Sequence, residues 1–176
     1  MKKEIERKFL LRDLPIATPD FTLSEIQNII QYYYLVDGIW KRIRKIESNV
    51  YGQQFLHTIK TYKDGITYEE EYIASYTEYK TLVSNINSGK YDSRFISKTR
   101  HIYLTGTDAD FEGEIKNIKW EIDDFTFKLV VAEIEIPDFQ YPIQIPRFIN
   151  DKVIYEVTNI PEFSNKNLAQ PLIFNK

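Results

Sequence analysis

The chain contains no cysteine, which excludes disulfide bonds and thiolate metal sites and agrees with a cytoplasmic protein. Histidine is also scarce, since only His57 and His101 are present. A metal site would therefore depend on carboxylates. Carboxylate oxygens favour hard cations such as Mg²⁺ or Mn²⁺ over zinc.

The sequence has no apolar run near the roughly 20 residues that a membrane helix needs, and acids follow its first lysines too closely for a signal peptide. The net charge of −3 disfavours general binding to nucleic acid or anionic membranes. We therefore expect neither as a partner. With 43% hydrophobic residues and no linker or internal repeat, residues 1–176 are expected to form one domain.

Aromatic and β-branched residues recur in short runs, a pattern that predicts strands. The dipeptide Asp37-Gly38 between two such runs is a hairpin signal. The sequence predicts strands near residues 2–11, 30–36, 39–47, 53–62, 67–74, 95–104, 119–124, 129–136 and 153–158.

Helical periodicity is strongest over residues 75–86. Ser75 and Glu78 have the spacing of a capping box that begins this helix, and Ser88-Gly89 ends it. Shorter helical segments are expected at residues 24–30 and 164–168.

Charged residues alternate along most of the expected strands. Because successive side chains of a strand face opposite sides, several like-charged pairs share a face. These pairs are Glu4 and Glu6, Arg42 and Arg44, Glu69 and Glu71, Lys98 and Arg100, Glu121 and Asp123, and Glu133 and Glu135. A solvated face explains any one strand, but like charges on one face repel. The repetition predicts that bases surround a polyanion and that acids hold its metal ion.

The segment Glu4-Ile5-Glu6-Arg7-Lys8 resembles the ExExK motif of the CYTH domain, the family of triphosphate tunnel metalloenzymes. Further segments resemble this family's motifs in the family's order. They are Gln31-Tyr32-Tyr33-Tyr34-Leu35, Trp40-Lys41-Arg42-Ile43-Arg44, Thr58-Ile59-Lys60, Glu69-Glu70-Glu71, Lys98-Thr99-Arg100, Glu121-Ile122-Asp123, Glu133-Ile134-Glu135, Tyr155-Glu156-Val157-Thr158, Phe163-Ser164-Asn165 and Leu168-Ala169.

This resemblance implies a mainly β (α+β) fold: an eight-stranded antiparallel β-barrel, or tunnel, with a charged lumen and a few flanking helices. It implies divalent-metal-dependent hydrolysis of triphosphates, and inorganic triphosphate is the expected small-molecule substrate. Adenylate cyclase and thiamine or nucleoside triphosphatase are alternatives within the family. A non-catalytic polyphosphate- or nucleotide-binding module is an alternative of another class.

The expected roles follow residue by residue. The phosphate-binding residues would be Lys8, Arg42, Arg44, Lys60, Lys98 and Arg100, and the Mg²⁺ or Mn²⁺ ligands would be Glu4, Glu6, Glu133 and Glu135. Lys8, with Glu4 and Glu6, is the catalytic candidate, either as a base for water or as a charge that neutralises the transition state. Secondary candidates are Glu69, Glu71, Glu121, Asp123 and Trp40, the last as a stacking surface or a rim aromatic.

The sequence departs from the family pattern at two places. Thr67 stands where the family usually has an arginine, and Lys63 or Lys166 could supply that cation. No His-Phe pair precedes Glu4, which disfavours the cyclase.

Residues on the opposite faces need a different explanation. The alternation turns His57 and His101 away from the basic residues, so both are expected to be structural. Apolar residues there must be covered by the helix, by the terminal segment or by a second subunit in a homodimer. They are Ile5, Phe9, Ile43, Ile59, Ile134 and Ile136.

Overall fold

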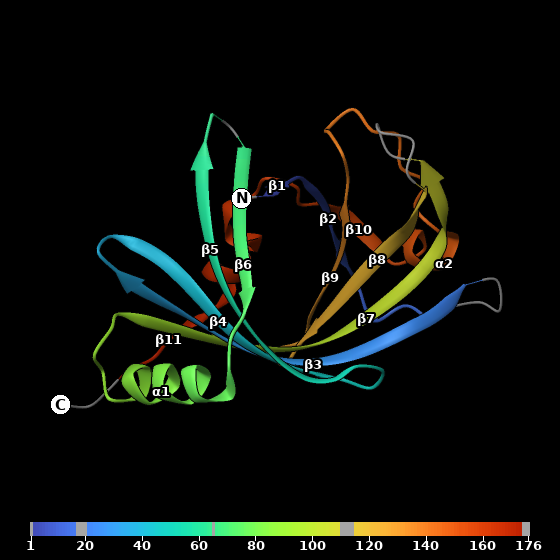
Figure 1. Cartoon of the computed structure of the whole chain (residues 1–176). Helices are drawn as coiled ribbons and strands as arrows, with labels where there is room; N and C mark the ends of the chain where they lie inside the picture. Colours follow the sequence, from blue (N-terminus) through green and yellow to red (C-terminus); the bar gives the residue numbers. More distant parts are fainter. Residues whose placement is uncertain (1, 17–20, 65, 110–114, 174–176) are drawn as a thin grey trace. The chain divides into compact units, whose positions relative to one another are not determined.

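A computed structural model describes residues 2–16, 21–64, 66–109 and 115–173 (Figure 1). The chain divides into two compact units. The first comprises Met1–Glu4, Asn28–Ser97 and Ile160–Lys176, and the second comprises Ile5–Gln27 and Lys98–Asn159. Strands β3 (Thr22–Val36) and β7 (Ser93–Ala109) each run from one unit into the other.

The first unit is built on antiparallel strands. Its hydrogen-bonded order is β1 (Lys2–Glu4), β6 (Ile66–Ile73), β5 (Gly52–Lys63), β4 (Ile39–Ser48), β3, β7 and β11 (Gln170–Pro171). Asp37 and Gly38 have positive φ angles of 52° and 76° between β3 and β4. These angles match the tight hairpin turn that Asp-Gly favours, so the predicted hairpin is confirmed.

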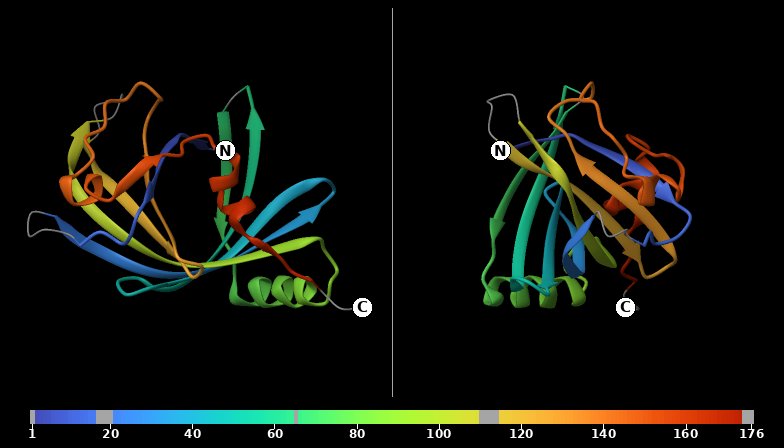
Figure 2. Two further views of the ribbon diagram at one scale, coloured as in Figure 1. Left: turned by 180° about the vertical axis from the view of Figure 1, so that it is seen from behind. Right: turned by 90° about the vertical axis from the view of Figure 1, so that its right-hand side faces the viewer.

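Helix α1 (Tyr76–Asn87) packs on one face of this sheet and begins where the sequence predicts. The Ser75 side chain accepts a hydrogen bond from the Glu78 backbone, and the Ser75 backbone donates to the Glu78 carboxylate at 2.8 Å. Figure 2 shows the helix running across the end of the sheet where β6 finishes. Its apolar stripe of Tyr79, Leu82 and Ile86 packs with Ile43 and neighbouring side chains of the sheet. The helix is therefore one of the expected covers for the apolar face.

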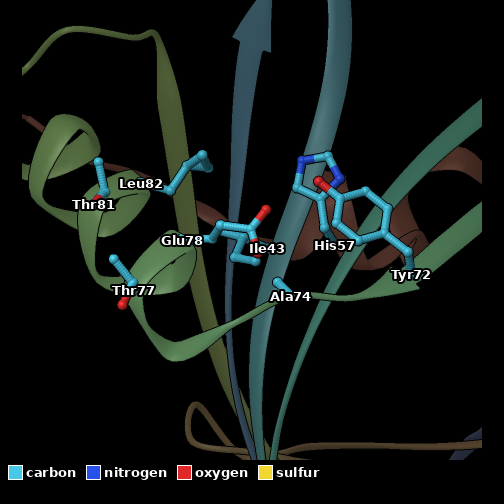
Figure 3. A pocket seen from close by; sticks show the side chains of 8 residues that line it. All are labelled: Ile43, His57, Tyr72, Ala74, Thr77, Glu78, Thr81 and Leu82. Atoms are coloured by element: carbon cyan, nitrogen blue, oxygen red, sulfur yellow. The ribbon is translucent and has the colours of Figure 1, made fainter.

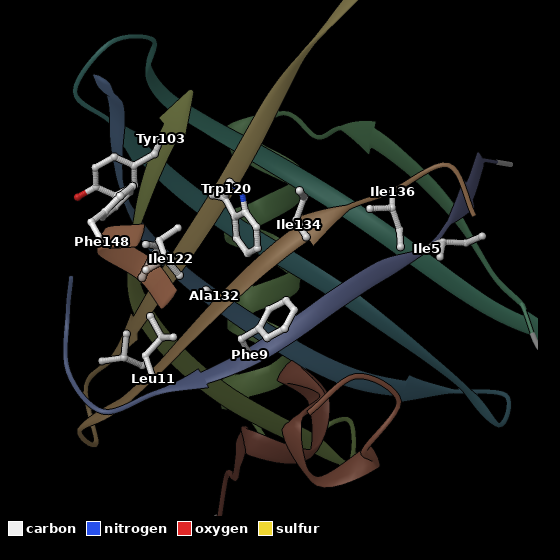
Figure 4. Packing of buried hydrophobic residues seen from close by; sticks show 12 residues of the cluster. Ile5, Phe9, Leu11, Tyr103, Trp120, Ile122, Ala132, Ile134, Ile136 and Phe148 are labelled. Carbon is white, nitrogen blue, oxygen red and sulfur yellow. The ribbon is translucent and has the colours of Figure 1, made fainter. Parts of the chain in front are cut away.

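The second unit has the strand order β3, β7, β8 (Ile115–Phe125), β9 (Leu129–Glu135), β2 (Glu6–Leu11) and β10 (Val153–Glu156). One face carries an apolar cluster around Phe9, Trp120 and Ile134 (Figure 4). Phe148 and Ile149 of the short helix α2 (Arg147–Asn150) join this cluster. The segment around α2 thus covers the apolar residues of β2, β8 and β9.

The prediction of a mainly antiparallel β fold with a few helices is confirmed. The structure has eleven strands rather than the expected eight, and the strand order of neither unit closes on itself among the described residues. One source of the larger number is Ile5, which divides the expected strand 2–11 into β1 and β2.

The prediction of a helix over residues 24–30 is wrong, because this segment is part of β3. The C-terminal segment contains a 3₁₀ turn (Pro161–Phe163) and the predicted last helix, α3 (Asn165–Leu168). None of the helices in the described ranges is long and apolar enough to cross a membrane.

Candidate functional site

The first unit gathers charged side chains on one face of β4, β5 and β6. The register places Arg42 opposite Thr58, Thr58 opposite Glu71, and Lys60 opposite Glu69. Because residues directly opposite each other point to the same side, these positions share a face. We call this set, with Arg44 and with Glu4 of β1, the first charged face.

Arg42 lies at the centre of the first charged face. Its Nη2 donates to Thr58 Oγ1 at 3.1 Å, to Glu69 Oε1 at 3.2 Å and to Glu71 Oε2 at 3.3 Å. Arg44 Nη2 donates to the same Glu71 oxygen at 2.9 Å. The Nε–H of Arg42 is buried without an acceptor in the described parts of the chain. Arg42 therefore retains a donor that an anionic ligand could occupy.

Lys60 joins β5 to the N-terminal strand of the first unit. Its Nζ donates to both oxygens of Glu4, at 2.7 and 2.6 Å, and lies 3.3 Å from Glu69. Burial by itself would raise the pKa of Glu69, but Lys60 and Arg42 outweigh it and lower this pKa to about 2. Glu69 is thus kept ionised by these two bases.

The second unit has a comparable face on β7, β8, β9 and β2. The register places Lys8 opposite Glu133, Glu133 opposite Glu121, and Arg100 opposite Asp123. We call this set, with Lys98 of β7 and Glu6 of β2, the second charged face.

Asp123 anchors the bases of the second charged face. Its side chain is fully buried, and it accepts from Arg100 Nε at 2.7 Å and from Arg100 Nη2 at 2.8 Å. Lys98, which is 3% exposed, also donates to Asp123. Arg100 further contacts Glu121, and its Nη2 lies 3.2 Å from Glu133 Oε2. Asp123 therefore positions these bases, although the sequence analysis ranked it only as a secondary candidate.

Lys8 lies between two carboxylates, with Nζ 2.8 Å from Glu6 and 2.9 Å from Glu133. Burial would lower its pKa, but these two acids raise it well above the usual lysine value. The ammonium form is therefore the stable form of Lys8. This state fits the role of a fixed charge better than that of a base for water.

The pKa of Lys98 is shifted in the opposite direction to that of Lys8. Burial and the nearby Arg100 charge lower the pKa of Lys98 to about 8, against the opposing effect of Asp123 and Glu133. Burial would also raise the pKa of Glu121, but Arg100 and Lys119 lower it to about 2.

The segment Glu156–Thr158 contacts β2, the strand that carries Lys8. The Lys8 backbone donates to Thr158 Oγ1 at 3.0 Å, and the Val157 backbone donates to the Lys8 carbonyl at 2.8 Å. Arg7, on the opposite face of β2, forms a bidentate ion pair with Glu156. Its Nε donates to Oε1 at 2.8 Å and its Nη2 donates to Oε2 at 2.7 Å. This segment fixes the position of Lys8 through the backbone.

The four expected metal ligands do not form a cluster of the kind that would hold a metal by itself. The described residues contain no group of three or more acidic or histidine side chains with metal-site geometry. Glu6 and Glu135 stand directly opposite each other on β2 and β9, while Glu133 pairs with Lys8 and Glu4 with Lys60. Two facing carboxylates nevertheless match Mg²⁺, which takes one or two carboxylates with water and substrate phosphates.

Trp40 lies on the first charged face by strand alternation, two residues before Arg42. The guanidinium carbon of Arg94 lies 5.2 Å from the centre of its indole ring, and Lys166 Nζ lies 5.9 Å from it. Arg94 also donates to the Lys166 carbonyl at 3.3 Å. The sequence analysis missed Arg94 because it began that strand at residue 95. The same alternation would have placed Arg94 with Lys98 and Arg100.

Other predicted positions are placed as follows. His57 is buried on the face opposite Lys60, and His101 pairs with Ile122 on the face opposite Arg100, so both point away from the basic residues. Thr67 pairs with Tyr62 and with Glu4 at the edge of the first charged face. Lys63 is exposed, and strand alternation places its side chain on the face opposite Lys60. Of the two expected substitutes for the missing arginine, Lys166 is therefore the better candidate.

Comparison with known proteins identifies the fold. No protein-family model matches the chain, and no curated protein matches it. The crystal structure of the inorganic triphosphatase NE1496 is similar, with a TM-score of 0.53 and 24% identity over 94% of this chain and 97% of that chain. The PH1819 protein from Pyrococcus horikoshii OT3 has a TM-score of 0.51 and 15% identity over 78% of this chain and 80% of its own. The likeness concerns the fold. It agrees with the fold that the sequence resemblance implies.

Proposed function

We propose that this protein hydrolyses triphosphates with the help of a divalent metal ion, and that inorganic triphosphate is its substrate. The observation that carries the proposal is the gathering of paired bases among acids on one face of each unit. The fold similarity to an inorganic triphosphatase supports the same reaction. The predicted cytoplasmic location and the homodimer remain expectations from the sequence.

The bases have complementary tasks in this proposal. Arginine grips two phosphate oxygens at once, so Arg42, Arg44 and Arg100 would orient the phosphate chain, while Lys60 and Lys98 would act as point charges. Lys8 would neutralise charge that develops on the phosphoryl group, since its neighbouring acids keep it protonated. Each base must exchange a carboxylate partner for a phosphate oxygen when the substrate binds.

The metal would be Mg²⁺ or Mn²⁺. Glu6 and Glu135 are the ligands that their facing positions favour, and Glu4 and Glu133 are the further candidates. When bound, such an ion polarises phosphate oxygens and offsets the charge of the leaving group.

The surroundings of Trp40 favour a substrate without an aromatic ring. Arg94 and Lys166 already lie over the indole, so a base or a thiazole would have to displace a cation from it. For a linear triphosphate, the same two cations add positive charge to the edge of the first charged face. They would take the place of the arginine that is absent at Thr67.

A phosphate-release assay tests the proposal. Purified protein is offered inorganic triphosphate, ATP or thiamine triphosphate with Mg²⁺, Mn²⁺ or a chelator, and cyclic AMP is measured in the ATP reactions. We expect metal-dependent release of phosphate, fastest from inorganic triphosphate. Tight binding of triphosphate by calorimetry without any release would refute the hydrolase and establish the binding module, and cyclic AMP formation would establish the cyclase.

A further inference from the structure

A pocket of about 250 Å³ lies in the first unit on the face of the sheet opposite the first charged face (Figure 3). Its sheet side is formed by Ile43, His57, Tyr72 and Ala74, and its helix side by Thr77, Glu78, Thr81 and Leu82. The apolar contacts of α1 are made mainly by Tyr79, Leu82 and Ile86. The first turns of the helix therefore leave a space between themselves and β5 and β6.

His57 gives this pocket its chemical character. The side chain is only 7% exposed, its Nε2 lies 2.5 Å from the Tyr34 hydroxyl, and its Nδ1 is buried without a hydrogen-bond partner in the described chain. Buried polar atoms are rarely unpaired, so this nitrogen calls for an explanation. Figure 3 shows the imidazole on the sheet side of the pocket, with Tyr72 beside it. The two ring centroids are 4.9 Å apart and the rings are tilted by 30°.

The Tyr34 contact determines which proton His57 carries. Tyr34 is buried, and burial raises the pKa of its hydroxyl, so the hydroxyl keeps its proton. If this hydroxyl donates to Nε2, only one donor, Nδ1–H, is left over. The reverse arrangement would leave both the tyrosine proton and the Nδ1 lone pair unpaired. Nδ1–H is therefore the unpaired donor of His57, a residue that lines the pocket.

The other wall carries an acceptor. The pKa of Glu78 is lowered by its hydrogen bonds with Ser75, so the carboxylate is ionised at the first turn of α1. Burial and the charge of Lys41 lower the pKa of His57, which keeps the imidazole neutral. The pocket thus combines a neutral donor, an anionic acceptor and aromatic and aliphatic walls. An anionic ligand that lies beside Glu78 would be repelled by its carboxylate.

We propose that this pocket is a second ligand site, separate from both charged faces, for a small uncharged planar molecule that carries a hydrogen-bond acceptor next to an N–H donor. A primary aromatic amide and an amino-substituted nitrogen heterocycle belong to this class. The acceptor receives Nδ1–H of His57, the N–H group donates to Glu78, and the ring packs between Tyr72 and Leu82. The volume lies just below the roughly 300 Å³ of common ligand pockets and suits a molecule of one or two rings.

The position of the pocket links it to the charged face through the strands. His57 and Thr58 are neighbours on β5, and Ile43 lies between Arg42 and Arg44 on β4. A ligand behind the sheet therefore contacts the same strands that carry these arginines. Any coupling between the two sites would act equally in both directions.

The test uses benzamide and benzoate as matched probes, because they share a ring and a size but differ in the N–H donor and the charge. Imidazole resonances of His57 are followed by NMR in the full-length protein as each probe is added. We expect benzamide to shift the His57 signals with a saturable dissociation constant on the order of 1 mM, as for other small fragments. Benzoate is expected to leave them unchanged.

Two variants locate the binding. Thr81→Leu fills the pocket from an exposed helix position and is expected to abolish the benzamide shift. Lys80→Leu introduces the same side chain one residue away, outside the pocket lining, and is expected to leave the shift intact. The proposal is overturned if benzamide leaves His57 unaffected up to its solubility limit, if benzoate shifts it equally, or if both variants respond like the original protein. None of these outcomes would decide whether the protein hydrolyses triphosphate, which the phosphate-release assay tests separately.

Discussion

The two lysines of the second charged face, Lys8 and Lys98, have pKa values that are shifted in opposite directions. Lys8 has two carboxylates within 3 Å, so its charge is compensated twice. Lys98 shares the buried Asp123 with Arg100, so its charge is compensated less completely. At Lys98, burial and the nearby Arg100 charge outweigh Asp123 and Glu133, whereas at Lys8 the two acids outweigh burial.

Lys8 is the residue at which a loss of charge should affect the reaction most. We expect Lys8→Gln to reduce kcat for triphosphate hydrolysis by about 100-fold or more, as removal of one preorganised donor does in other enzymes. Lys8→Arg should retain a larger part of the rate because it keeps the charge. Steady-state phosphate release measures both, with the exposed Arg12→Gln as a control. Equal losses in Lys8→Arg and Lys8→Gln would contradict a purely electrostatic role.

Arg94 and Lys166 should contribute to substrate binding rather than to the chemical step. The double variant Arg94→Gln with Lys166→Gln removes two cations from the edge of the first charged face, and we expect KM for triphosphate to rise about tenfold with little change in kcat. Thr67→Arg in the same background should restore part of the affinity. Lys63→Gln is the control, since Lys63 is exposed and turned away from this face. A KM that is unchanged in the double variant would exclude this role.

Asp123 should matter for stability as well as for the site. Asp123→Asn preserves the shape of the side chain but removes the buried charge that Lys98 and Arg100 share. Breaking a buried ion pair usually costs about 3 kcal/mol or more, so we expect a loss of that order in the free energy of unfolding. Urea denaturation measures it. A loss below about 0.5 kcal/mol would mean that Glu121 and Glu133 compensate both cations without Asp123.

At the scale of the elements, strand alternation allowed much of the site to be predicted. The period of two is a property of the strand itself, so the sequence shows which residues share a side without knowledge of the neighbouring strands. Arg42 with Arg44 and Lys98 with Arg100 follow from it. The partners do not, because the pairing of Lys8 with Glu133 joins residues 125 positions apart in the chain. Register of this kind depends on which strands become neighbours.

The errors at this scale have physical causes as well. Residues 24–30 have enough helical character to suggest a turn, but strand pairing in the folded protein makes them part of β3. The helix α1 was predicted well because its cap and its apolar stripe are local signals. The charge pattern did not identify Asp123 as a main contact of Lys98 and Arg100, because its burial beside them depends on how the strands pack.

The capping box of α1 supplies a prediction for one element. Ser75→Ala removes the side-chain acceptor for the Glu78 backbone, which leaves an N-terminal N–H of the helix without its partner. We expect the free energy of unfolding to fall by about 1 kcal/mol. The midpoint of a urea transition reports this loss, and Ser84→Ala, an exposed position in the middle of the same helix, is the matched control. Equal stability of the two variants would show that packing alone holds α1.

At the scale of the whole molecule, both units balance their buried charge internally. The first charged face sets Arg42, Arg44 and Lys60 against three acids, which are Glu4, Glu69 and Glu71. The second sets its three bases against four acids. In the proposed reaction, phosphate would have to compete with these carboxylates for the bases.

The same balance makes the stability of the protein depend on pH. Glu69 and Glu121 have pKa values of about 2 in the folded state, below the roughly 4.3 of an unfolded chain. The unfolded chain therefore binds these protons more readily. The stabilisation is complete above a pH of about 4.3 and is lost as pH falls through about 2. We expect the free energy of unfolding, measured by urea denaturation, to decrease steeply over this interval.

Single variants separate this effect from general acid denaturation. Glu121→Gln should make the acid slope shallower, because one of the groups with a lowered pKa is gone, and it should lower stability near pH 7. Glu70→Gln, at an exposed position between Glu69 and Glu71, should leave the slope unchanged. An acid slope that is identical in Glu121→Gln and the original protein would show that Glu121 does not contribute to the pH dependence.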